Sequence, residues 1–145
     1  MNVVVEVERI GDHAAGLGKT VIWTGDVPLL NPLIDIPRMA ELVHIMLRES
    51  FQALIRLDVD LVKAAAAEDD EMDGLSMVVF AELVEIMSRV KDSGTRAMYL
   101  LWCAHNPRRI EDRVTNIAER VIFITTGDMK VHNPKPIEVD LLVKF

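Results

Sequence analysis

The chain has 145 residues, half of them hydrophobic but only 5% aromatic, and a formal net charge of −7. This length suits one domain with a buried core, and few aromatic residues with eight methionines favour packed helices over sheets. The negative charge argues against nucleic-acid binding and against attachment to an anionic membrane surface, because both use basic surfaces. One cysteine, Cys103, excludes an internal disulfide, and neither a signal peptide nor a membrane span is recognisable. The composition therefore predicts a soluble, cytoplasmic, all-α protein.

The first predicted helix covers residues 3–24. Its apolar residues recur at alternating steps of four and three, which is the spacing of one helix face, and Gly25 is the expected stop. The stripe consists of Val3, Val7, Ile10, Ala14, Leu17 and Val21. The following stretch is rich in proline and is expected to be a connector that ends at Asp35.

Three further helices are predicted, so the expected fold is an antiparallel up-down bundle of about four helices. The second spans residues 36–57 with Asp35 as its N-cap, and Asp58 is expected to cap a third helix over residues 59–90. The fourth follows a turn at residues 91–94 and ends before Gly127. Pro107 lies inside its pattern and should either kink that helix or remove its first part. No structure is assigned to the tail, residues 130–145.

Apolar stripes predict which face of each helix is buried. The second helix places Ile36, Met39, Val43, Met46, Ser50, Ala53 and Leu57 on one stripe. The third places Val62, Ala65, Ala66, Asp69, Asp73, Ser76, Phe80, Leu83 and Met87 together. The fourth carries a packing seam of Ile110, Val114, Ile117, Val121 and Ile124. The third stripe is unusual because two acids interrupt it.

Carboxylates spaced four residues apart on a helix share a face, and this spacing recurs. It occurs at Glu8/Asp12 and Asp69/Asp73, and a variant has Arg108 ahead of Asp112. Facing acid pairs on neighbouring helices supply the oxygen ligands preferred by Mg²⁺, Mn²⁺ or iron.

An ion pair is the competing explanation of the same pattern. The Arg108 guanidinium could neutralise Asp69 and Asp73 directly, without any metal. The residues alone leave both readings open.

Two segments of the chain resemble each other across 100 positions. Residues 6–23 read EVERIGDHAAGLGKTVIW and residues 106–123 read NPRRIEDRVTNIAERVIF, with five identities and no gap. Such wide spacing suggests a duplicated helical unit with one incomplete copy.

These motifs resemble a known family. ERIGDHA at residues 8–14 and TNIAERVIFITTG at residues 115–127 resemble the repeated signature of PhoU-type phosphate-uptake regulators. Between them, DVDLVKAAAAEDDEMDGL at residues 58–75 resembles the middle helix of that family. The resemblance runs from about residue 3 to residue 129.

The resemblance implies a fold, partners and metal ligands. Members of the family typically contain two similar three-helix bundles and act as cytoplasmic repressors of phosphate uptake, together with a phosphate ABC transporter and a membrane sensor kinase. Some hold metal clusters in Glu/Asp-x-x-x-Asp motifs. By position, the metal ligands implied are Glu8 and Asp12 in the first unit, and Asp69, Asp73 and Asp112 in the second. The implied cofactor is a divalent or iron-type metal ion.

The chain departs from the family pattern in sequence and in length. Arg108 stands at the family's glutamate position and Gly16 at its asparagine position. The first two helices of the first bundle are absent. The expected domains are residues 1–25, the last helix of an incomplete repeat; 26–35, a connector; 36–129, a complete three-helix repeat; and 130–145, a tail.

The sequence favours a non-enzymatic regulator of phosphate uptake that docks onto partner proteins and binds metal. The first helix carries more apolar surface than one neighbour can cover, which predicts a homodimer. Two alternatives remain: a carboxylate-bridged metalloenzyme in a helical bundle, and a structural dimerisation module.

Overall fold

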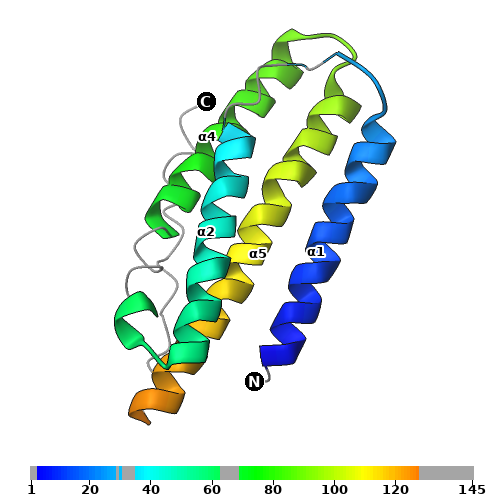
Figure 1. Cartoon of the computed structure of the whole chain (residues 1–145). Coiled ribbons are helices and arrows are strands. Elements are labelled where there is room, and N and C mark those ends of the chain that lie inside the picture. The colour runs from blue at the N-terminus through cyan, green and yellow to red at the C-terminus, as the bar shows by residue number, and fades with distance from the viewer. Residues whose placement is uncertain (1–2, 29, 31–34, 63–68, 128–145) are drawn as a thin grey trace.

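The computed structural model describes residues 3–28, 30, 35–62 and 69–127. Four helices with defined bounds make up most of these residues: α1 (Val3–Thr24), α2 (Asp35–Arg56), α4 (Asp69–Arg89) and α5 (Gly94–Thr126) (Figure 1). Residues 59–62 are also helical. The all-α prediction is confirmed, and three of the four predicted helices agree with the structure to within two residues at each end.

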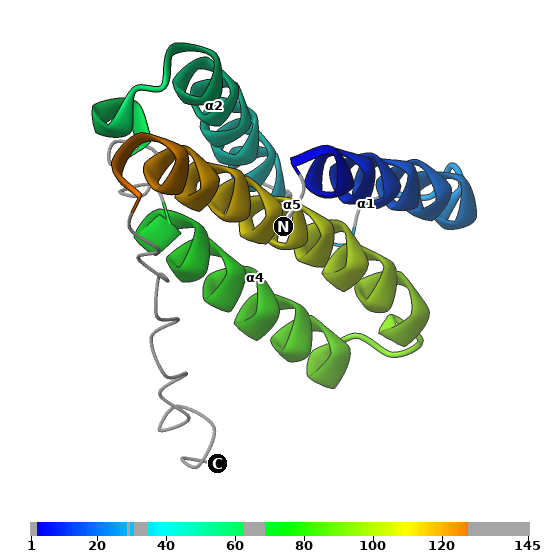
Figure 2. The ribbon, with the colours of Figure 1, turned by 90° about the horizontal axis from the view of Figure 1, so that it is seen from below.

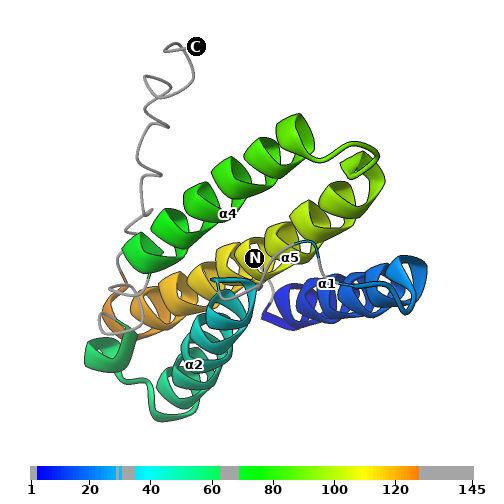
Figure 3. The ribbon, with the colours of Figure 1, turned by 90° about the horizontal axis from the view of Figure 1, so that it is seen from above.

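The long helix α5 is the centre of the bundle. Figures 2 and 3 show α5 between α1 and α4, and Figure 1 shows it between α1 and α2. α2 and α4 also contact each other, which makes α2, α4 and α5 a closed three-helix unit. Within the described residues α1 contacts no helix except α5. α1 is therefore attached to the bundle along one side only.

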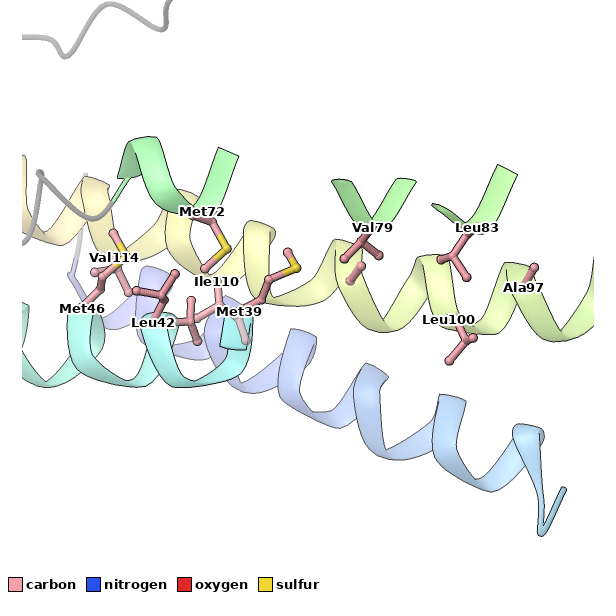
Figure 4. Close-up of a cluster of buried hydrophobic side chains, with 12 residues drawn as sticks. Met39, Leu42, Met46, Met72, Val79, Leu83, Ala97, Leu100, Ile110 and Val114 are labelled. Carbon is pink, nitrogen blue, oxygen red and sulfur yellow. The ribbon is translucent and has the colours of Figure 1, made fainter. Parts of the chain in front are cut away.

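The core lies inside the three-helix unit. Apolar side chains from α2, α4 and α5 point toward one another there (Figure 4). Its buried members are Met39, Leu42, Val43, Met46, Met72, Val79, Leu83, Ala97, Leu100, Ala104, Ile110 and Val114. Methionine is unbranched and fills irregular gaps, so Met39, Met46 and Met72 suit a core enclosed by the faces of three helices.

The predicted seams of α2 and α5 are largely confirmed. Met39, Met46 and Ala53 on α2 are buried, and so are the α5 seam residues from Ile110 to Val121. The stripe ends earlier than predicted on both helices. Leu57 and Ile124 are exposed because α2 has ended by Leu57 and the last turn of α5 projects beyond its neighbours.

Asp58 caps the helical turn that follows α2. Its Oδ1 accepts hydrogen bonds from the backbone N–H groups of Asp60 and Leu61, at 3.0 and 3.2 Å. These bonds satisfy donors that have no partner in a first turn, so the N-cap prediction is confirmed. The predicted single helix over residues 59–90 is represented by residues 59–62 and by α4, and residues 63–68 lie outside the described part of the chain.

Pro107 does not shorten α5. The helix continues through it from Gly94 to Thr126, and the proline ring is buried. The prediction that Pro107 removes the first part of the helix is therefore wrong. α5 ends as predicted at Gly127, whose φ of 77° lies in the left-handed region that glycine adopts without a side-chain clash.

The buried face of α1 differs from the predicted stripe. The two most buried residues are Glu6 and Thr20, neither of which belongs to that stripe. The residues turned toward α5 are Val3, Glu6, Ile10, His13, Leu17, Thr20 and Thr24, and all of them are buried or half-buried. Val7, Ala14 and Val21 are exposed instead. α1 is thus rotated about its axis relative to the predicted orientation, because Glu6 and His13 pair with polar residues of α5.

Two predictions concern residues that the structure does not describe. The tail, residues 130–145, lies outside the described part, and so do residues 31–34 of the connector. Among the residues that are described, no helix is both long enough and apolar enough to cross a membrane.

Candidate functional site

Asp73 on α4 forms an ion pair with Arg108 on α5. Both side chains remain partly open to solvent, at 47% and 39% of full exposure. The negative charge of Asp73 is thus compensated by the guanidinium of Arg108. This pair links α4 to α5 within the closed three-helix unit. Arg108 stands at the position where the family pattern has a glutamate.

The predicted buried stripe of the third helix is wrong in part: Val62 and Leu83 are buried, whereas the side chains of Ala65, Ala66 and Asp69 lie outside the described part of the chain. The buried residues of α4 are Met72, Val79 and Leu83. Of the predicted stripe, Phe80 and Met87 are exposed. Asp73 is half-buried at the flank of α4 nearest Arg108, so its charge is not enclosed in a dry core. The buried face of α4 has the predicted helical period but lies about one residue earlier, at Met72 and Val79 instead of Asp73 and Phe80.

Asp112 also has a guanidinium partner. The Arg109 guanidinium donates to Asp112 Oδ2 at 3.0 Å and to His105 Nε2 at 3.3 Å. Accepting this bond requires a neutral imidazole. Partial burial lowers the pKa of His105 below its ordinary value, the positive charges of Arg109 and His13 lower it further, and Asp112 opposes them.

The remaining predicted ligands do not join this cluster. Glu8 and Asp12 are exposed on α1, and α1 makes no contact with α4 within the described residues. Asp69 is the first residue of α4, and its side chain lies outside the description. Among described side chains, no three His, Cys, Asp or Glu residues lie close enough together to hold a metal ion. As placed, Asp73 and Asp112 are satisfied by arginine, and the five-residue metal assignment stays a prediction.

Glu6 is a buried acid that the sequence analysis did not single out. It is 3% exposed, and its Oε2 accepts a hydrogen bond from Asn116 Nδ2 at 3.1 Å. The Arg113 guanidinium lies 3.6 Å from the same oxygen. A buried carboxylate needs such partners, because leaving it unpaired costs several kcal/mol. Val3, Glu6 and Ile10 follow one another at steps of three and four residues, which is the spacing of one helix face. The sequence therefore predicts this buried face if a packing face is allowed to contain polar residues.

A second polar contact lies further along the same pair of helices. His13 Nδ1 and Asn106 Oδ1 are 3.2 Å apart. A Cβ added to Gly16 would lie 3.4 Å from the same Asn106 oxygen. Gly16, which departs from the family's asparagine, therefore lies against the Asn106 side chain of α5. The α1–α5 interface is held by specific polar pairs as well as by apolar contacts.

The PhoU domain family matches residues 36–121, which is more than half of the chain and covers α2, α4 and most of α5. The chain belongs to the PhoU domain family.

Relatives in that family carry the same printed description, phosphate-specific transport system accessory protein PhoU homolog. The homolog from Zymomonas mobilis is 34% identical over 123 residues, covering 83% of this chain and 51% of the relative. The one from Aquifex aeolicus is 31% identical over 130 residues, covering 90% and 59%. The one from Clostridium acetobutylicum is 29% identical over 127 residues, covering 88% and 58%. The chain thus spans only about half to three-fifths of the length of these PhoU relatives.

A solved PhoU structure has the same fold. The crystal structure of the phosphate transport system regulatory protein PhoU from Streptococcus pneumoniae matches with a TM-score of 0.80 and 24% sequence identity. The match covers 88% of this chain and 60% of the pneumococcal chain. The match must therefore extend into α1, and the solved structure shares this helical fold.

Proposed function

We propose that this protein regulates phosphate uptake at the cytoplasmic side of the membrane, by docking onto a phosphate ABC transporter and the membrane sensor kinase that works with it, without catalysing a reaction. The PhoU domain match over residues 36–121 carries the proposal. The relatives are described as accessory proteins of a phosphate-specific transport system. This chain spans only part of the length of those relatives, so we assign their regulatory role to it as a proposal.

An exposed apolar stripe on α4 supports docking. Met77, Phe80, Val84 and Met87 follow one another at steps of three and four, and all four are exposed. Phe80 keeps 50% of its surface in solvent. Apolar side chains contiguous on a surface commonly mark a protein–protein contact, because covering them is favourable by about 25 cal/mol per Å². We call these four residues the α4 stripe and assign it to the transporter.

Charging the α4 stripe tests the docking proposal. We expect Phe80→Asp combined with Val84→Asp to reduce co-purification with the transporter at least about tenfold, since a docked carboxylate would lose its water without gaining a partner. In host cells lacking the native chain, the double variant should also fail to restore repression of phosphate uptake. Both positions are exposed, so thermal unfolding should remain close to that of the wild type.

The matched control is Val78→Asp. It adds one negative charge at an exposed position on the same helix, about 100° or more around the axis from each residue of the α4 stripe. This variant should dock and repress normally. Wild-type behaviour of the double variant would contradict the assignment of the stripe, whereas unchanged phosphate uptake after deletion of the chain would contradict the regulatory function itself.

Metal binding is a separate part of the proposal. Asp73 and Asp112 carry the carboxylates, but Arg108 already neutralises Asp73. A metal ion bound with Asp69, Asp73 and Asp112 as ligands would have to displace that guanidinium. Such an ion would have a structural role, since a divalent cation would link α4 to α5 at the position of the Asp73–Arg108 ion pair.

Arg108→Glu tests this idea. The substitution removes the competing cation and restores an acid four residues before Asp112, so we expect Mn²⁺ affinity measured by calorimetry to rise at least about tenfold. The control is Arg89→Glu, which changes the net charge equally at an exposed pair with Glu85. Equal Mn²⁺ affinity in the two variants would rule out a carboxylate site here.

A further inference from the structure

The α4 stripe is an apolar surface that the described part of the chain leaves largely open to solvent. Its four members, Met77, Phe80, Val84 and Met87, are between 37% and 55% exposed. They extend over about 15 Å of α4, at a rise of about 1.5 Å per residue. α4 lies on the opposite side of α5 from α1 (Figures 2 and 3), so α1 does not reach the stripe.

Residues 137–145 carry an apolar pattern of their own, and we call them the tail segment. They lie outside the described part of the chain. Apolar residues recur there at every second position, namely Ile137, Val139, Leu141, Val143 and Phe145. The positions between them, 138, 140 and 144, are charged, with Leu142 as the exception. This alternation is typical of a segment with one apolar and one polar side, and burial of the apolar side is favourable.

The chain that follows α5 is long enough to bring the tail segment to the α4 stripe. α4 and α5 run antiparallel (Figure 1), and Asp73 of α4 pairs with Arg108 of α5. With this pair as the reference level, the α4 stripe lies about 35 to 50 Å from Gly127 along the axis of α5. An extended chain covers about 3.3 Å per residue, so Val139 to Phe145 can reach about 40 to 59 Å from Gly127. The two ranges overlap.

Two prolines favour the extended connection that this reach requires. Pro134 and Pro136 lie between Gly127 and the tail segment. Proline fixes its own φ and restricts the residue before it to extended conformations, so Asn133 and Lys135 are disfavoured in a helix. The sequence ahead of the tail segment therefore favours length over compaction.

The spacing of the two sets of apolar side chains is compatible as well. Alternate residues of an extended segment are about 6.6 Å apart, and successive members of the α4 stripe are about 4.5 to 6 Å apart along the helix axis. We propose that the tail segment packs along the α4 stripe of the same chain, with Val139, Leu141 and Val143 against it. The tail segment then competes with the transporter for the stripe, a consequence that rests on the proposed function.

Disulfide crosslinking in the whole chain tests the proposal. Cys103→Ser removes the native thiol, and Val84→Cys is combined with Val143→Cys. Under a mild oxidant this pair should form a bond within one chain at least about tenfold faster than the control pair, because packing holds the two sulfurs within bonding distance. Leu141→Cys in place of Val143→Cys allows for a shift of two residues in register.

The matched control uses Glu85→Cys in place of Val84→Cys. Glu85 is the next residue of α4, and its exposed side chain points about 100° around the helix axis from that of Val84. Its ion pair with Arg89 is also exposed, so the substitution should leave folding intact. Equal crosslinking rates at Val84 and Glu85 with both tail positions, or a bond that joins two chains instead of one, would overturn the proposal.

A chain ending at residue 136 separates this proposal from the assignment of the stripe to the transporter. Without the tail segment the stripe is open, so binding to the transporter should tighten at least about tenfold. Preferential crosslinking at Val84 with unchanged transporter binding would support the packing of the tail segment and contradict the docking assignment. Tighter binding without preferential crosslinking would instead overturn the placement of the tail segment.

Discussion

Leu42→Ala is expected to destabilise the protein by about 2–5 kcal/mol, which is the usual cost of removing a fully buried leucine side chain. Leu42 is 1% exposed on α2, and Figure 4 places it beside Met72 of α4 and Ile110 and Val114 of α5. Alanine would leave a cavity where three helices meet. These helices cannot all move inward at once, so the cavity should persist. Urea unfolding followed by circular dichroism measures the change.

Ile55→Ala is the control for this prediction. Ile55 lies on the same helix but is 82% exposed, and its replacement should change the free energy of unfolding by less than about 0.5 kcal/mol. Equal destabilisation by the two substitutions would mean that the core is not centred on the α2–α4–α5 unit. The comparison also separates burial from helix propensity, since both variants introduce alanine into α2.

Arg113→Ala is expected to destabilise the protein by about 3 kcal/mol, because it leaves the buried Glu6 carboxylate without its cationic neighbour. Asn116 still donates one hydrogen bond to Glu6, which keeps the loss below the cost of a fully isolated charge. The loss should be concentrated in α1, which contacts only α5 within the described residues. Amide hydrogen exchange should therefore accelerate in α1 well before it changes in α2.

Two further variants separate charge burial from packing. Arg89→Ala removes an exposed ion pair with Glu85, 2.8 Å long, and should cost less than about 1 kcal/mol. Glu6→Gln in the Arg113→Ala background should recover part of the loss, since a neutral amide can still accept from Asn116 without requiring a cation. No recovery, with α1 still exchanging rapidly, would show that Arg113 acts through the packing of its carbon chain.

The buried seams of α2 and α5 could be predicted from the sequence because each is a continuous apolar stripe. Met39, Met46, Val114 and Val121 recur at helical spacing with few polar interruptions, and all of them are buried. A helix with one clear apolar face has one favourable orientation in a bundle, so periodicity alone determined it. The caps were equally local: Asp58 and Gly127 act within a few residues of themselves.

The orientations of α1 and α4 could not be predicted in this way, because both helices have more than one apolar face. In α1 the pairing of Glu6 and His13 with polar residues of α5 decided which face turned inward, and Val7 and Val21 were left outside. In α4, Met72 and Val79 took the core while Phe80 stayed exposed. The contacts that decide the orientation of α1 join residues about 100 positions apart, which periodicity within one helix cannot register.

The sequence by itself determined the helical class, the ends of three helices, the seams of α2 and α5, and the likeness to PhoU regulators. These features depend on local spacing, capping and motif identity, which a linear sequence contains in full. The tertiary structure alone decided that Arg108 forms an ion pair with Asp73, that Glu6 is buried, and that Val7 and Val21 of α1 are exposed. Each of these depends on which side chains meet across helices, and burial and charge pairing are settled only when the helices are packed together.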